Sequence, residues 1–326
     1  MTNIAINGFG RIGRLFYRQI AAKKGFEVVA INDLGNAENL AYLLKYDTVY
    51  GKFEGKLPAT VLQEKDPAKL PWKKLGIDIV VEATGVFDSF EKSKAHLQAG
   101  AKRVVITAPA DDADGELGRT VLMGVNDKDL AMCKISSNAS CTTNSIASVI
   151  QVLDEAIGVS KALLNTTHGY TATQSLVDSP VKGKDLRRGR AAAQNIIPSS
   201  TGAAIATTRA VKSLQGKFDG IALRVPVPAG SIADITFVAK RITTVEEVNS
   251  ALTKAAGSTR FKNILQVTSD PVVSADIVGQ PYGAIVDLAF TRVVDGDLVK
   301  VLSWYDNEWG YASTLVKHVE AVAKLV

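Results

Sequence analysis

The chain has 326 residues, of which 46% are hydrophobic and 22% are charged, and its formal net charge at pH 7 is +5. These values are typical of a globular protein large enough for two domains, and no apolar run approaches the roughly 18 residues of a membrane helix. With two cysteines, three histidines and no Cys-x-x-Cys spacing, the composition excludes a zinc module, and the absence of an aromatic-basic stripe argues against nucleic-acid binding.

The first predicted element is a strand at residues 3–7 with no signal-peptide pattern before it, so we expect a cytoplasmic protein without membrane contact. The next six residues, Gly-Phe-Gly-Arg-Ile-Gly, open a helix. In such a turn Gly8 permits the tight bend, Gly10 lets a pyrophosphate approach the backbone, and Gly13 allows close packing of helix on strand. The sequence predicts dinucleotide binding here, with these candidate cofactor residues: Gly8, Gly10, Arg11, Ile12 and Gly13.

The second predicted strand, residues 27–33, ends on Asp33, which lies 20 residues beyond Gly13. A carboxylate at this spacing accepts hydrogen bonds from the adenosine ribose hydroxyls. It also repels a 2′-phosphate, and Leu34 and Gly35 supply no cation to receive one. We therefore expect NAD rather than NADP as cofactor, with the basic loop 182–190 as an alternative source of a phosphate contact.

Strands at residues 77–82 and 103–107, separated by a helix at about 89–99, continue the alternation of strand and helix. This alternation predicts a doubly wound, parallel α/β sheet. Ligands of such sheets bind beyond the carboxyl ends of the strands. Thr84 and Thr107, which follow two of these strands, are therefore further candidate cofactor contacts.

Cys141 begins a segment with apolar residues at helical spacing: Ile146, Val149, Ile150, Leu153 and Ile157. The positive end of a helix favours the thiolate, so we expect the pKa of this thiol to fall and Cys141 to be a nucleophile. His168 ends an apolar strand and enters a polar loop, which makes it the candidate base. His96 and His318 lie in predicted helices. The alternative for a lone cysteine or histidine is a packed structural side chain.

After this helix the predicted strands lie at residues 220–228, 231–241, 264–269, 283–294 and 298–305. The last two flank Asp295-Gly296, a strong hairpin turn. The one clear internal helix begins near Thr244, which is a suitable N-cap, and a terminal helix begins at Ala312. This second part predicts an α+β domain with a largely antiparallel sheet.

Four stretches, at residues 6–14, 137–144, 195–204 and 304–311, are similar in sequence and order to those of glyceraldehyde-3-phosphate dehydrogenases. The resemblance extends over essentially the whole chain. It implies a Rossmann NAD-binding domain of residues 1–140 and 306–326, a catalytic domain of residues 141–305, and a homotetramer. It also implies a place in glycolysis or gluconeogenesis, although a reversible site does not indicate the direction.

The resemblance implies that Cys141 attacks the aldehyde of glyceraldehyde 3-phosphate to give a thiohemiacetal. His168 then takes the hydroxyl proton while hydride passes to NAD. Inorganic phosphate cleaves the resulting thioester to 1,3-bisphosphoglycerate. The Cys141 backbone N–H and protonated His168 are the expected donors to the oxyanion.

By resemblance, hydroxyls, a glycine N–H and guanidinium groups form two phosphate pockets: Ser140, Thr142, Thr171, Arg188, Thr201, Gly202 and Arg224. Arg187 is the alternative to Arg188. Asn307 resembles the side chain that holds the nicotinamide carboxamide, and Tyr305 and Tyr311 resemble residues of the site wall.

Ser145 stands where the family commonly has a second cysteine, and Ser179 replaces a frequent leucine or glycine. The first change removes a disulfide response to oxidation within that motif. Three other functions remain as alternatives. A hydrolytic erythrose-4-phosphate dehydrogenase would not require phosphate, and a non-catalytic NAD-binding protein would not need Cys141 or His168. An additional nucleic-acid role would rest only on the isoelectric point near 9.0 and the basic loop.

Overall fold

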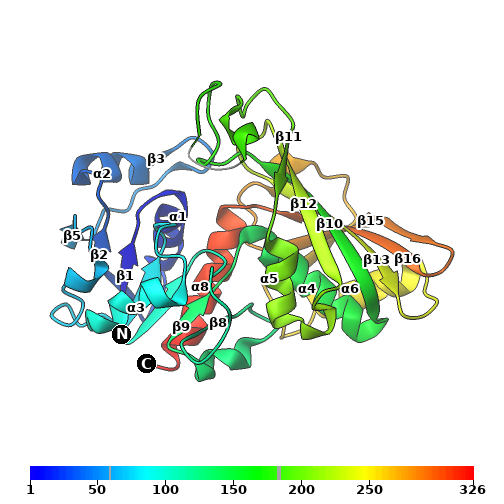
Figure 1. Cartoon of the computed structure of the whole chain (residues 1–326), viewed down its shortest axis with the longest axis horizontal. Helices are drawn as coiled ribbons and strands as arrows, with labels where there is room; N and C mark the ends of the chain where they lie inside the picture. Colours follow the sequence, from blue (N-terminus) through cyan, green and yellow to red (C-terminus); the bar gives the residue numbers. More distant parts are fainter. Residues whose placement is uncertain (59, 182–184) are drawn as a thin grey trace. The chain divides into compact units, whose positions relative to one another are not determined.

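The computed structural model describes residues 1–58, 60–181 and 185–326. Two compact units form, one of Met1–Ser140 with Ala312–Val326 and one of Cys141–Tyr311 (Figure 1). The second boundary follows Tyr311 rather than Tyr305. Residues 182–184 of the basic loop lie outside the described residues.

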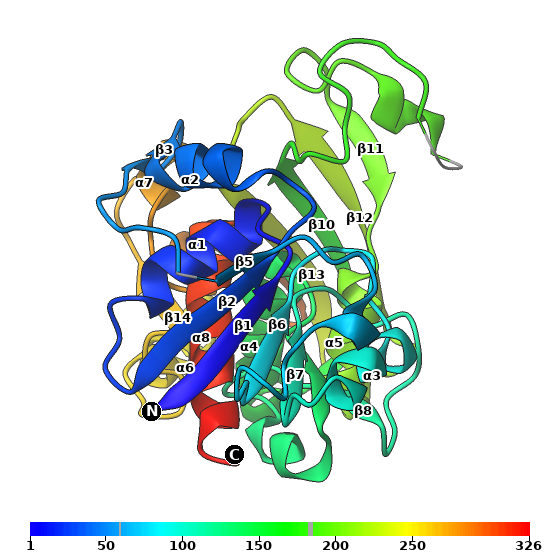
Figure 2. The same cartoon turned by 90° about the vertical axis from the view of Figure 1, so that its left-hand side faces the viewer.

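The sheet of the first unit is parallel throughout the part of the chain that the structure describes. Its strand order is β5-β2-β1-β6-β7-β9-β8, and Figure 2 shows β5, β2, β1, β6 and β7 side by side. The strands are β1 Thr2–Asn7, β2 Phe26–Asn32, β5 Thr60–Leu62, β6 Ile79–Glu82, β7 Arg103–Ile106, β8 Gly118–Thr120 and β9 Ile135–Ser137. The order runs outward in both directions from β1 and β6, which confirms the predicted doubly wound sheet and places its switch point between these two strands.

Both faces of this sheet are covered by helices. Successive residues of a strand point to opposite faces, so each strand contributes side chains to two separate cores. Ile4 and Ile6 belong to a core with α1 (Arg11–Ile20) and α8 (Trp309–Ala323), whereas Ala5 belongs to a second core with α3 (Phe90–Gln98). The remaining elements are α2 (Ala37–Lys45), the hairpin β3 (Tyr46–Asp47) and β4 (Gly51–Lys52), and the 3₁₀ turns η1 (Pro67–Lys69) and η2 (Asp127–Met132).

The second unit has a mixed sheet in the order β11-β12-β10-β13-β16-β15-β14. Its strands are β10 Val159–Gly169, β11 Ile197–Ser200, β12 Phe218–Val225, β13 Ser231–Ala239, β14 Leu265–Thr268, β15 Ala284–Val294 and β16 Leu298–Tyr305. Two pairings, β10 with β12 and β14 with β15, are parallel, and the other pairings between described strands are antiparallel. Asp295 and Gly296 have positive φ angles of 48° and 75°, as the predicted hairpin turn requires.

The helices of this unit are α4 (Cys141–Ala156), α5 (Ala203–Ala210), α6 (Val245–Ala256) and the single turn α7 (Ser274–Ile277), with 3₁₀ turns η3 (Leu186–Gly189) and η4 (Lys212–Leu214). The Thr244 side chain accepts the N–H of Glu247, which confirms it as the N-cap of α6. The expectation of one clear internal helix after α4 was wrong, because α5 and α7 are present besides α6. Helix α5 consists mainly of alanine and threonine, so its sequence lacks apolar periodicity, yet packing against α4 supports it.

The terminal helix α8 begins at Trp309, three residues earlier than expected. The Asp306 carboxylate accepts the N–H groups of Glu308 and Trp309, each at 2.8 Å, and these contacts fix that start. Over the described ranges, none of the helices combines the length and apolar character that crossing a membrane requires.

Candidate active site

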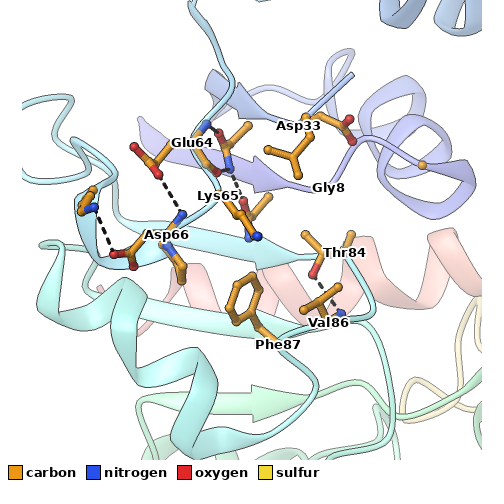
Figure 3. A pocket seen from close by; sticks show the side chains of 15 residues that line it. Gly8, Asp33, Glu64, Lys65, Asp66, Thr84, Val86 and Phe87 are labelled. Atoms are coloured by element: carbon orange, nitrogen blue, oxygen red, sulfur yellow. Dashed lines mark hydrogen bonds and ion pairs between the residues drawn. The ribbon is translucent and has the colours of Figure 1, made fainter. Parts of the chain in front are cut away.

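A cavity of about 900 Å³ opens at the carboxyl ends of β1, β2 and β6 in the first unit (Figure 3). This is the switch point of the sheet, where ligands of doubly wound folds bind. The lining comes from the loops that follow these strands and from the segment after β5: Asn7, Gly8, Gly10, Asn32, Asp33, Leu34, Glu64, Lys65, Asp66, Pro67, Lys69, Ala83, Thr84, Val86 and Phe87.

The glycines of the first turn meet the steric demands predicted for them. Gly8 has a φ of 93°, and a Cβ there would lie 2.6 Å from the backbone of Ala83 and Thr84. A Cβ on Gly13 would lie 2.2 Å from the carbonyl oxygen of Gly8, whereas nothing lies within 4 Å of a Cβ on Gly10. The turn is therefore closed toward the sheet and open toward the cavity, which suits the backbone approach of a pyrophosphate.

Asp33 is held against the cavity wall by two backbone groups. Its Oδ2 accepts the N–H of Phe9 at 2.7 Å, and its Oδ1 accepts the N–H of Gly35 at 2.8 Å. Figure 3 shows Asp33 and Gly8 at the same end of the cavity. Arg11, Ile12, Gly13 and Thr107 are not among the lining residues. Arg11 instead pairs with Asp47 at 2.5 Å.

In the second unit, Cys141 is the first residue of α4 and His168 lies near the end of β10. Cys141 Sγ lies 3.4 Å from His168 Nε2. The parallel register of β10 and β12 places His168 opposite Arg224. The structure therefore brings together three residues that are widely separated in the sequence: a thiol, an imidazole and a guanidinium.

Burial controls the electrostatics of this group. It raises the pKa of the Cys141 thiol, and the opposing effects of Arg224 and of the Thr142 backbone N–H do not overcome it. The pKa decrease expected from the helix terminus was therefore wrong, because the desolvation of a thiolate outweighs the helix dipole. Burial, together with the Arg224 charge, also lowers the pKa of His168 to about 3. At neutral pH the pair is a thiol and a neutral imidazole, so the protonated His168 expected from the resemblance is not the resting form.

Nδ1 of His168 faces both a donor and an acceptor. Arg224 Nη1 lies 2.6 Å away and the carbonyl oxygen of Gly169 also lies 2.6 Å away. When Nδ1 carries the proton it donates to Gly169, and Nε2 is free to accept the thiol proton. When Arg224 donates to Nδ1, Nε2 carries the proton and faces the sulfur. Only the first of these tautomers can accept the thiol proton at Nε2.

Tyr305 connects the nucleophile loop to the histidine strand. Its hydroxyl lies 2.8 Å from Thr142 Oγ1 and 2.7 Å from Thr166 Oγ1, and its ring packs edge-on at 5.9 Å from the His168 ring. Burial raises the pKa of this phenol, so it remains protonated. Tyr305 is therefore a direct neighbour of two predicted site residues, and Tyr311 is also buried.

The arginines of the polar loop differ in what they contact. Arg188 donates to Thr173 Oγ1 and to Ser199 Oγ, both at 3.3 Å, and Thr173 lies 3.0 Å from Thr171 Oγ1. Arg187 instead pairs with Asp185 at 2.8 Å. The geometry favours Arg188 as the anion ligand. The sequence reasoning missed Thr173 and Ser199, although Thr173 follows the predicted Thr171 by two residues.

Two further predicted residues are fixed by local contacts. Thr201 Oγ1 accepts the N–H of Ala203, and Gly202 precedes the first turn of α5. Asn307 Oδ1 accepts the N–H of Gly230 at 3.1 Å and the hydroxyl of Ser231 at 2.9 Å. These contacts orient the Asn307 amide so that its nitrogen is directed away from them.

Comparison with known proteins identifies the family. Residues 2–90 match the NAD binding domain of glyceraldehyde 3-phosphate dehydrogenase, and residues 140–307 match the C-terminal domain of the same enzyme. The chain belongs to the glyceraldehyde-3-phosphate dehydrogenase family. A glyceraldehyde-3-phosphate dehydrogenase of Clostridium pasteurianum is 47% identical over 100% of this chain and 99% of its own length. Those of Streptomyces coelicolor and Mycobacterium avium are each 48% identical, covering 96% and 98% of both chains respectively.

Ser145 is the residue near Cys141 at which the resemblance leads us to expect a difference from the family. Its hydroxyl lies 2.9 Å from Ser303 Oγ, and both side chains are buried. A paired serine at this position satisfies its own hydrogen bond and offers no thiol to Cys141.

Proposed function

We propose that this protein is a phosphorylating, NAD-dependent glyceraldehyde-3-phosphate dehydrogenase of glycolysis and gluconeogenesis. It converts glyceraldehyde 3-phosphate and inorganic phosphate to 1,3-bisphosphoglycerate. The observation that carries the proposal is the 3.4 Å approach of Cys141 Sγ to His168 Nε2 at the start of α4, in a member of this family. The unit of Met1–Ser140 and Ala312–Val326 binds NAD, and the unit of Cys141–Tyr311 carries the catalytic residues.

The neutral imidazole of His168 accepts the thiol proton, and the thiolate of Cys141 attacks the aldehyde carbon. Nε2–H and the Cys141 backbone N–H then stabilise the oxyanion, which takes a proton to give the thiohemiacetal. His168 removes that hydroxyl proton as the carbon–hydrogen bond breaks and a thioester forms. Bound NAD supplies the hydride acceptor. A phosphate oxygen attacks the thioester carbon and releases the Cys141 thiolate.

The anionic groups of substrate and phosphate need donors on both sides of the reacting carbon. We assign this role to Ser140, Thr142, Thr171, Arg188, Thr201, Gly202 and Arg224. The contacts of Arg188 with Thr173 and Ser199 support its assignment over Arg187. Tyr305 holds the hydroxyl of Thr142 in place.

The cofactor contacts are proposed from the cavity of the first unit, where Gly8, Gly10, Asp33 and Thr84 are lining residues. We assign Arg11, Ile12, Gly13 and Thr107 supporting roles in the surrounding loops. Asn307 binds the nicotinamide carboxamide through its amide. The family resemblance also supports a homotetramer in the cytoplasm.

The test is NADH formation from purified protein, NAD and glyceraldehyde 3-phosphate, measured with and without inorganic phosphate. Sustained turnover that requires phosphate supports the proposal. Equal turnover without phosphate means that water resolves the thioester, as in the hydrolytic relatives that act on erythrose 4-phosphate. No NADH under either condition contradicts the proposed activity altogether.

A further inference from the structure

Beneath the floor of the cavity in the first unit lies a pair of ionisable side chains that the proposed chemistry does not use. Glu82 is the last residue of β6 and His96 belongs to α3. Their side chains are 2% and 0% exposed, and Glu82 Oε2 lies 3.0 Å from His96 Nε2. Burying a carboxyl group costs free energy unless hydrogen-bond donors surround it, so the burial of Glu82 depends on its partners.

Four donors converge on the two oxygens of Glu82. Oε2 receives Nε2–H of His96 and Nδ2 of Asn7, the latter at 2.6 Å. Oε1 receives the backbone N–H of Thr84 at 2.8 Å and the Thr84 hydroxyl. Since every partner donates, Glu82 acts purely as an acceptor, which is the role of a carboxylate.

Each of the three side-chain donors is fixed by a second hydrogen bond. Trp72 Nε1–H donates to His96 Nδ1 at 3.0 Å, which leaves the ring proton on Nε2. Asn32 Nδ2 donates to Asn7 Oδ1 at 2.7 Å, so the amide nitrogen of Asn7 must face Glu82. The N–H of Val86 donates to Thr84 Oγ1 at 3.1 Å, which directs the hydroxyl proton toward Glu82.

The chain of hydrogen bonds extends to the cavity surface. Asn7, Asn32 and Thr84 all line the cavity. Asn32 also accepts the N–H and donates to the carbonyl of Glu64, both at 2.8 Å, and Glu64 lies on a different part of the lining from Thr84 (Figure 3). One network thus connects the ends of β1, β2 and β6 with the segment that follows β5.

We propose that Glu82, oriented by His96, is a positioning residue that fixes the shape of the dinucleotide cavity and thereby sets the affinity for NAD. This inference rests on the proposed NAD-binding function. The side-chain donors to Glu82 cannot rotate away from it without breaking the second hydrogen bond that each of them makes. An amide in place of the carboxylate presents an N–H to at least one of them, and the cavity loops must then shift.

The test is Glu82→Gln in the full-length protein. We expect the Kd and KM for NAD to rise on the order of tenfold, the loss of about one hydrogen bond to a charged group. Turnover at saturating NAD and the KM for glyceraldehyde 3-phosphate should be unchanged. The matched control is Asp78→Asn, an acid-to-amide change before the opposite end of β6. Asp78 accepts the N–H of Asn3 at 2.8 Å and pairs with Lys102 at 2.7 Å, away from the cavity lining.

A second substitution tests the orientation of His96. Trp72→Phe removes the indole N–H, so His96 becomes free to carry its proton on Nδ1 and to accept at Nε2. The double variant Glu82→Gln/Trp72→Phe should recover part of the lost NAD affinity, whereas Trp72→Phe alone should change it little. If Glu82→Gln does not fold, His96→Phe tests the same network, because His96 is not a lining residue.

Unchanged NAD affinity in folded Glu82→Gln, or in His96→Phe where that variant carries the test, overturns the inference. So does an equal loss in Asp78→Asn, which would indicate general destabilisation, and so does a double variant that recovers nothing. A wild-type protein that binds no NAD contradicts the proposed function itself, before any variant is compared.

Discussion

The sulfur of Cys141 lies 3.4 Å from Nε2 of His168, although 27 positions separate the two residues in the chain. The contact arises because α4 packs against β10 within one compact unit. Both groups are neutral at pH 7, since burial raises the pKa of the thiol and lowers that of the imidazole to about 3.

Replacing Cys141 should abolish turnover but should not weaken NAD binding. For Cys141→Ser we expect kcat to fall on the order of 10³-fold or more, because a serine hydroxyl is far less acidic than a thiol and is a much weaker nucleophile. The affinity for NAD should stay unchanged, since every cavity-lining residue belongs to the other unit. Steady-state kinetics and NAD titration measure the two quantities. Substantial remaining turnover would remove Cys141 from the mechanism.

His168→Asn should slow the formation of the thioester and of NADH, which precedes the attack of phosphate. General base catalysis contributes about 10²–10⁴-fold, so the initial burst of NADH should slow by a factor in that range. Rapid-mixing measurement of the burst separates this step from phosphorolysis. The thermal unfolding profile of the variant serves as the control for folding. A burst at the wild-type rate would contradict the assignment of His168 as base.

The two neighbouring arginines provide an internal comparison. Arg188→Ala should raise the KM for phosphate or glyceraldehyde 3-phosphate about 10- to 100-fold, the effect of losing a hydrogen-bonded charge on an anion. Arg187→Ala should leave both constants near the wild-type value, because Arg187 pairs with Asp185. The reverse result would transfer the phosphate contact to Arg187.

Cofactor choice should depend on Asp33. Its carboxylate is held by the N–H groups of Phe9 and Gly35 and repels a 2′-phosphate. We expect kcat/KM for NAD to exceed that for NADP by at least about 10-fold, and Asp33→Asn to narrow the difference. A wild-type protein that prefers NADP would show that another cation of the chain receives the 2′-phosphate.

Acid should destabilise the fold through its buried histidines. The pKa of His318 falls from 6.5 to about 3 because the ring is buried, where Ser136 and Asn138 contact its two nitrogens at 2.7 and 3.1 Å. Between these pH values the unfolded chain binds a proton that the folded chain does not, so stability falls as pH decreases. Each such histidine contributes about 1.4 kcal/mol per pH unit.

His318→Gln should therefore be less stable at pH 7.5 but should lose stability less steeply on acidification. Urea unfolding at several pH values between 7.5 and 4.5 measures the slope. Equal slopes in the wild type and the variant would mean that the pKa of His318 is the same in the folded and the unfolded chain.

Features that depend on local pattern could be predicted from the residues alone. The glycine turn, the acid at Asp33, the helix that begins at Cys141 and the hairpin at Asp295-Gly296 all follow from spacing and residue type, because backbone sterics and periodicity act over a few residues. Family resemblance added the phosphate and nicotinamide contacts. Helix α5 was missed because its support comes from α4 and not from its own apolar pattern.

The tertiary structure alone decided the interactions between distant segments. It directs Arg188 toward hydroxyls and Arg187 toward a carboxylate, and it surrounds Glu82 with donors from β1 and α3. It also reversed the expected pKa shift of Cys141. The desolvation of a group depends on all the atoms that pack around it. These atoms come from distant parts of the chain, so the pKa shift follows only from the folded structure.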